Sequence, residues 1–218
     1  MQKSEHSSED ILLGLQFWVE EASAARKAAA YVRCYVEVQT GYLEEKEKSG
    51  GTLSDPHNNP VARVAYGRLY ATWRELVLFS CRAIHDQSGY GLRGIKNDLY
   101  KLYSSDVSTG IASLKIEFKD FDRHNEERLD EIVCLRKKAV AHSDLETIFR
   151  EMETNTKVSD VVELAEAVVS LLEKMCSAYL TTRTLSSEEA RSLIIHHEVH
   201  AAHDARKFWE HNFARWAK

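Results

Sequence analysis

Apolar residues of this chain recur every three or four positions over long stretches that hardly contain a helix-breaking residue. Near the N-terminus this set comprises Leu15, Trp18, Ala22, Ala25, Ala29, Val32 and Val36. Such spacing brings side chains to one face of an α-helix, so it predicts a long amphipathic helix. The 218 residues include only 2 prolines and 9 glycines, and no stretch alternates apolar and polar residues as a half-buried strand does. We therefore predict an all-α fold, a bundle of about six or seven helices.

Local signals predict where the helices begin. The first should begin after residues 7–10, Ser-Ser-Glu-Asp, because these side chains can accept hydrogen bonds from the free N–H groups of a first turn. It should fade in the charged stretch 44–48. A second helix should start at Pro60, since proline loses no hydrogen bond at the first helical position. A shorter helix is predicted over residues 92–103, before a polar turn.

Four further helices are predicted in the second half of the chain. The fourth helix should end near Ala141 and carries an apolar face made of Ile111, Leu114, Phe118, Phe121, Leu129, Ile132, Val133 and Val140. Residues 143–146 and 186–189 both have the Ser-x-x-Glu form of a capping box, so a new helix is expected at each. Another amphipathic helix spans Val161 to Met175. The last helix should run unbroken from residue 186 to Trp216.

Charge and length limit the possible functions. The net charge of −5, from 34 acidic and 29 basic residues, disfavours broad attraction to a phosphate backbone, so a nucleic-acid site must be local. The length fits one domain over residues 1–218, with 186–218 as a C-terminal helix that docks on the bundle or on a partner. Four widely spaced cysteines indicate reduced thiols, and no apolar run resembles a signal or a membrane span. We expect a cytoplasmic protein that contacts no membrane.

The most informative stretch is 136–142, Arg-Lys-Lys-Ala-Val-Ala-His. Arg136 lies four residues after Ile132 and four before Val140, so its charge is predicted to fall within the apolar face and to need a partner. An arginine that reaches solvent from the edge of that face is the alternative. His142 would point about 120° away on an ideal helix. The two residues therefore share a site only if His142 lies at a helix corner, or if two chains meet about a two-fold axis.

The chemistry of this pair suits RNA cleavage. A histidine at the end of a helix feels the negative end of the helix dipole, which favours its protonated form. Such a group can protonate a leaving oxygen or, when neutral, accept the proton of a ribose 2′-OH. Arg136 supplies a planar set of donors for phosphate oxygens and stays charged at every relevant pH. Together the two residues could cut RNA without a metal ion.

The segment 135–144, Leu-Arg-Lys-Lys-Ala-Val-Ala-His-Ser-Asp, resembles the signature of the HEPN superfamily of RNA-cutting and RNA-binding domains. It is most similar to the abortive-infection branch labelled AbiU, in which the pattern Arg-x-Lys-x-x-Ala-His-x-Asp is typical. Residues 73–79, 82–86 and 91–96 are similar to that branch too, so the resemblance covers about residues 11–180. It implies a homodimer in which Arg136 and His142 of both chains line a shared cleft and cut RNA without metal or cofactor.

The resemblance also implies roles for the neighbours of the pair. We expect Lys137, Lys138 and Asp144 to contact the RNA. Many active members carry Asn, Asp or His where this chain has Lys137, so a non-catalytic module that binds RNA, nucleotide or a protein is the alternative. Members restrained by a nucleotidyltransferase antitoxin carry tyrosine at the position of Asp144, so any antitoxin or regulatory protein should act by another route. A purely structural bundle is the third possibility.

Two other features of the sequence have competing interpretations. Basic residues around the motif, with Arg123 and Arg128 first among them, form either an RNA track or a solvated helix face with charge pairs. On the last predicted helix His196, His200 and His203 fall on one face, which could bind zinc, although a polar face is the preferred interpretation and no metal is expected. The aromatic end of that helix should dock on the bundle or on a partner. It comprises Phe208, Trp209, Phe213 and Trp216.

Overall fold

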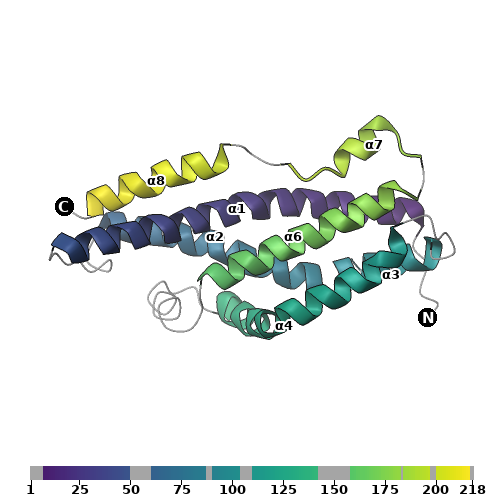
Figure 1. Cartoon of the computed structure of the whole chain (residues 1–218), viewed down its shortest axis with the longest axis horizontal. Helices are drawn as coiled ribbons and strands as arrows, with labels where there is room; N and C mark the ends of the chain where they lie inside the picture. Colours follow the sequence, from purple (N-terminus) through teal and green to yellow (C-terminus); the bar gives the residue numbers. More distant parts are fainter. Residues whose placement is uncertain are drawn as a thin grey trace.

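The computed structural model describes residues 7–49, 60–86, 90–103, 110–141, 158–182, 184–196 and 200–216. Within these ranges the chain forms seven α-helices and no strand (Figure 1). The helices are α1 (Ser8–Ser49), α2 (Pro60–His85), α3 (Leu92–Tyr103), α4 (Ile111–Ala141), α6 (Val158–Leu180), α7 (Ser187–Ser192) and α8 (Ala201–Trp216). The predicted all-α bundle is confirmed. The capping box predicted at residues 143–146 lies outside the described residues.

Helix starts follow the local sequence signals. At the start of α1 the Asp10 N–H donates to Ser7 Oγ (3.2 Å), and the Ser7 N–H donates back to Asp10 Oδ2 (2.8 Å). The same reciprocal arrangement, with distances of 3.2 and 2.7 Å, joins Ser186 and Glu189 at the start of α7. Helix α2 begins at Pro60 as predicted. At α1 and α7 the capping side chains accept hydrogen bonds from N–H groups that a helix start leaves free. At α2 the proline has no N–H group to leave unpaired.

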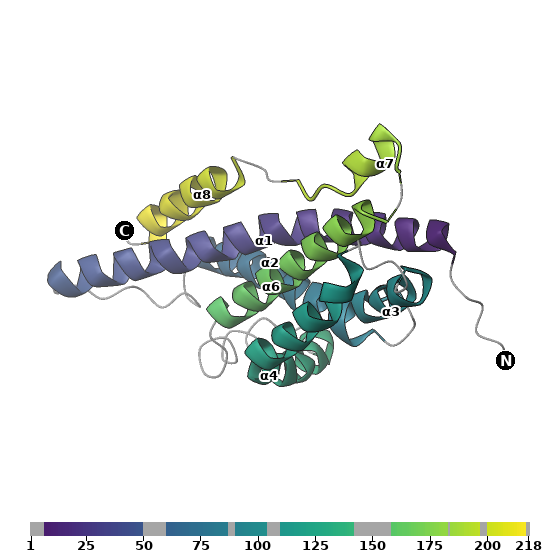
Figure 2. The ribbon, with the colours of Figure 1, turned by 45° about the vertical axis from the view of Figure 1, so that its right-hand side comes forward.

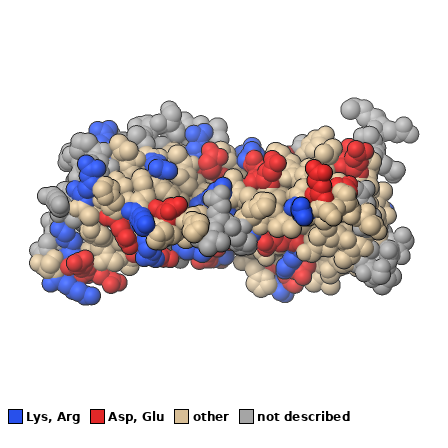
Figure 3. All heavy atoms as spheres, turned by 90° about the horizontal axis from the view of Figure 1, so that it is seen from above, with Lys and Arg blue, Asp and Glu red and all other residues tan. Residues whose placement is uncertain are grey.

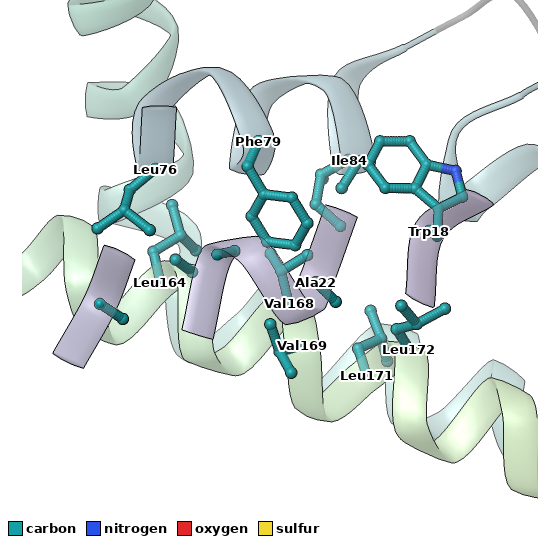
Figure 4. Close-up of a cluster of buried hydrophobic side chains, with 14 of the residues drawn as sticks. Trp18, Ala22, Leu76, Phe79, Ile84, Leu164, Val168, Val169, Leu171 and Leu172 are labelled. Carbon is teal, nitrogen blue, oxygen red and sulfur yellow. The ribbon is translucent and has the colours of Figure 1, made fainter. Parts of the chain in front are cut away.

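Four long helices, α1, α2, α4 and α6, pack side by side, and α3 lies across one end of the bundle (Figures 1 and 2). Their apolar faces meet in one continuous buried cluster that also includes residues of α8. Figure 4 shows its centre, where Phe79 of α2 and Val168 of α6 lie beside Ala22 of α1. The small alanine side chain allows α1 to approach both neighbours closely, which sets the mutual positions of α2 and α6.

Helix α4 is bent at Asn125, whose backbone is not helical (φ −122°, ψ 15°). The sequence pattern predicts one continuous helix here, because Phe121 and Leu129 lie on the same face as Asn125. The Asn125 side chain is buried, and its Nδ2 donates to the carbonyl oxygen of Phe121 at 2.9 Å. Arg128 donates to its Oδ1. A buried amide that needs hydrogen-bond partners thus accompanies the bend. The bend sets the direction of the half of α4 that carries the motif.

The prediction of one unbroken helix from residue 186 to Trp216 is wrong. Helix α7 ends at Ser192, and residues 194–196 are not helical before α8 begins at Ala201. Leu193 and Ile195 are buried, whereas Ile194 between them is more than half exposed. Two residues that are two positions apart point to nearly opposite sides of a helix, but to the same side of an extended chain. Burying both against the bundle therefore requires the helix to break.

Helix α8 docks on the bundle through its aromatic face, as the sequence suggested. Trp209 is almost completely buried, and its ring lies 5.0 Å from Tyr31 and 4.9 Å from Tyr35 between centroids. Its Nε1 donates to the carbonyl oxygen of Tyr31 (3.0 Å). Phe213 is buried too and stacks on Tyr42. Aromatic packing on α1 thus holds α8 in place. The side chain of Trp216 lies outside the described residues.

The cysteines agree with the prediction of reduced thiols. Cys34, Cys81 and Cys176 are buried, Cys134 is exposed, and all four are free. Among the helices that the structure describes, none combines the length and the apolar content that a bilayer span requires.

Candidate functional site

The C-terminal part of α4 carries the described half of the predicted site. Arg136 and Lys137 are both exposed there, and α4 ends at Ala141, as predicted. The side chain of Lys138, together with His142 and Asp144, lies outside the described residues. Their predicted roles therefore remain predictions.

The expectation that Arg136 lies within the apolar face is wrong, and the edge position is correct. Ile132 and Leu135 are buried, whereas Arg136 is exposed. The buried face thus continues through Leu135, and Arg136 borders it on the side of α2. Among the described residues no carboxylate forms an ion pair with Arg136, so none of them competes with an anion for its guanidinium.

Helix α2 supplies the surface beside Arg136. The Cys81 thiol donates to the carbonyl oxygen of Ile132 at 3.4 Å, which places one turn of α2 against one turn of α4. His85 follows Cys81 by four residues, and Arg136 follows Ile132 by four residues, so each lies on the face that this contact defines. The positive charge of Arg136 acts on both Cys81 and His85. The contact therefore places His85 of α2 and Arg136 of α4 along the line where these two helices meet. This line is called the seam below.

Arg93, from the first turn of α3, fixes the end of this seam. Its Nε donates to the carbonyl oxygen of Ile84 (3.2 Å), and its two Nη groups form a bidentate ion pair with Asp122 of α4. Arg93 thereby connects the C-terminal end of α2, at the residue before His85, to both α3 and α4. Because Ile84 lies near Asp122 while Cys81 lies near Ile132, α2 and α4 run antiparallel.

The surroundings favour a neutral His85. Partial burial and the positive charge of Arg93 lower the pKa of His85, and Arg136 adds to this effect, whereas Asp130 and Asp122 oppose it. Because its pKa lies below the ordinary value for histidine, the imidazole of His85 is mainly unprotonated at neutral pH. Burial raises the pKa of the neighbouring Cys81 thiol to about 11, so Cys81 stays protonated. The seam thus offers a fixed cation and a neutral base.

Two basic residues near the motif belong to ion pairs. Arg128 pairs with Asp160 and Glu163 of α6, and Arg123 pairs with Asp120 at 2.9 Å. Arg128 therefore faces α6, not α2. For these two residues the charge-pair interpretation of the sequence is correct, and any RNA track is shorter than the basic residues suggest.

The opposite side of the bundle has mixed charge. On the face shown in Figure 3, Lys and Arg side chains lie among Asp and Glu side chains. The ion pairs between α1 and its neighbours include Arg26 with Glu173, Arg33 with Glu166, and Arg206 with Glu37. Because its charges are balanced, the face formed by α1 and α8 should attract a phosphate backbone only weakly.

The C-terminal histidines do not share a helix face. Of the three histidines predicted to share a face, His196 lies in the non-helical segment after α7, His200 precedes α8, and only His203 lies within a helix. No group of three or more metal-ligating side chains occurs in the part of the chain that the structure describes. The zinc interpretation required these histidines to lie on one face of a single helix, and the structure does not place them so.

His85 is the residue of this seam that the sequence alone did not indicate. Its signal was present, because Cys81 and His85 are spaced four apart at the end of the predicted second helix. The partner helix, however, could not be assigned from spacing. Comparison of the chain with family models, with curated proteins and with solved structures found no match.

Proposed function

We propose that this protein is a metal-independent endoribonuclease of the HEPN type, which cuts RNA as a toxin or abortive-infection effector. One observation carries the proposal. Arg136 is exposed at the end of a buried helix face, beside a second helix and without an acidic partner among the described residues. An arginine so placed suits an anionic ligand better than a role in the fold.

In the proposed reaction Arg136 binds the scissile phosphate and stabilises the negative charge that develops on it. His142 transfers a proton, while Lys137, Lys138 and Asp144 hold the RNA on either side. The site is formed at the interface of a homodimer. No cofactor takes part, and an antitoxin or another regulatory protein restrains the activity.

The test uses purified protein with transfer RNA and messenger RNA in the presence of EDTA. We expect cleavage, and we expect Arg136→Ala to reduce the rate roughly 100- to 1,000-fold, as for the loss of one charge-stabilising donor. His142→Ala should be inactive. Arg215→Ala and His211→Ala are matched controls, because both side chains are exposed on α8. If the two site variants cut as fast as these controls, the residue assignment is wrong.

Subunit mixing tests the homodimer. When Arg136→Ala and His142→Ala proteins exchange subunits, one composite site regains both residues and part of the activity should return. A monomer at micromolar concentration would contradict the composite site.

Lys137 favours a second candidate function, RNA binding without cleavage. It is exposed next to Arg136 at the unusual position of the motif. In that case Arg136→Ala would weaken RNA binding, whereas the unmodified protein would cut nothing under the conditions of the first test.

A further inference from the structure

The seam between α2 and α4 contains a second group capable of proton transfer. We infer that His85 is the general base of the same site, which takes the proton from the ribose 2′-OH while Arg136 of the same chain holds the adjacent phosphate. This inference rests on the proposed function. It adds a residue from α2 to a site that the sequence motif assigned to residues 136–144.

The geometry of the two antiparallel helices supports this role. From the level of the Cys81 to Ile132 hydrogen bond, His85 and Arg136 lie one turn away in opposite directions, about 6 Å each along the axes. Helix side chains lean toward the N-terminus of their own helix. His85 therefore leans toward Cys81, and Arg136 leans toward Ile132. The two polar ends therefore point toward one another along the line where α2 and α4 meet.

His85 is suited to chemistry by its surroundings. It is exposed, and among the described residues it makes no hydrogen bond or ion pair that would engage its ring nitrogens. The charged groups that act on it come from two elements, Arg93 of α3 and Asp122, Asp130 and Arg136 of α4.

The proposed step conserves atoms and charge. The 2′ oxygen attacks phosphorus as its proton moves to a ring nitrogen of His85. The bond between phosphorus and the 5′ oxygen breaks, and the departing oxygen receives a proton from His142, the acid expected from the sequence, or from solvent. The products are a 2′,3′-cyclic phosphate and a 5′-hydroxyl end, and protonated His85 returns its proton to water.

The closing experiment compares His85→Gln with His124→Gln, whose histidine is also exposed but lies before the bend of α4. Single-turnover cleavage by His85→Gln should be at least roughly 100-fold slower, the lower range for loss of a general base. The increase of the rate with pH that marks deprotonation of a base should disappear as well. Binding of an RNA analogue with 2′-deoxyribose at the cleavage site should be unchanged, since that analogue has no proton to remove. His124→Gln should match the unmodified protein in all three measurements.

Three results would overturn the inference. One is that His85→Gln cuts like the control with the same pH profile. Another is that it loses analogue binding in parallel with cleavage, which would indicate a structural or binding role. The third is that mixing Arg136→Ala with His85→Gln subunits restores activity, because residues of one chain cannot complement each other in this way. If instead the unmodified protein cuts no RNA, the proposed function itself fails, and the inference fails with it.

Discussion

Replacement of Trp209 by alanine tests whether the aromatic packing of α8 stabilises the whole bundle. The Trp209 side chain is 1% exposed. A buried aromatic side chain removes roughly 150–250 Å² from water. At roughly 25 cal/mol per Å², this corresponds to about 4–6 kcal/mol as an upper value. Substitutions of buried aromatic residues by alanine cost about 3–5 kcal/mol in practice. The substitution also removes the hydrogen bond to the Tyr31 carbonyl oxygen.

We therefore expect Trp209→Ala to lower the free energy of unfolding by about 4 kcal/mol, measured by urea denaturation followed by circular dichroism. Trp209→Phe is the control, because it keeps most of the ring contacts and loses the Nε1 donor, at a cost of about 1–2 kcal/mol. Hydrogen exchange of the α8 amides reports whether the helix opens separately from the bundle. A loss below about 1 kcal/mol, together with unchanged exchange in α8, would refute the view that this ring holds α8 on α1.

Three further predictions concern the seam and the thiols. Arg93→Gln removes a positive charge beside His85, so the pKa of His85 should rise. The increase of the cleavage rate with pH should then move to higher pH, and an NMR titration that gives a lower pKa would contradict this. Because only Cys134 is exposed, a thiol reagent should modify one cysteine of the native protein rapidly and all four after unfolding. Burial raises the pKa of Cys176 from 9.0 to about 12, so the folded state retains a proton that the unfolded state loses above pH 9. Stability should therefore fall between about pH 9 and 12, and Cys176→Ala should flatten this fall in urea titrations.

The candidate site could be predicted only in part. The segment 136–142 indicated Arg136 because its charge lies four residues from both Ile132 and Val140. The same spacing placed it on the buried side, which was wrong, because Leu135 continues the buried face. A helical repeat of 3.6 residues leaves a choice between adjacent positions after several turns. In the structure Leu135 lies with Val161 and Leu164 of α6, so packing against α6 buries this position.

Helix type and most helix boundaries were determined by the sequence alone. Serine caps at residues 7 and 186, Pro60 at a helix start and the turn before residue 92 act through hydrogen bonds within a few positions, so they need no tertiary partner. The predicted starts at Pro60, at Leu92 and after Ser186 are confirmed, whereas α1 begins at Ser8, within the segment after which it was expected to start.

Only the tertiary structure decided where the last helix breaks, where α4 bends and which histidine lies beside Arg136. Leu193 and Ile195 leave the helix because both can be buried only in an extended chain. Likewise, His85 and Arg136 lie along the same seam because α2 and α4 pack antiparallel with Cys81 against Ile132. These features depend on contacts between residues distant in sequence. Local spacing carries no information about which helix faces which, and packing of the buried faces supplies it.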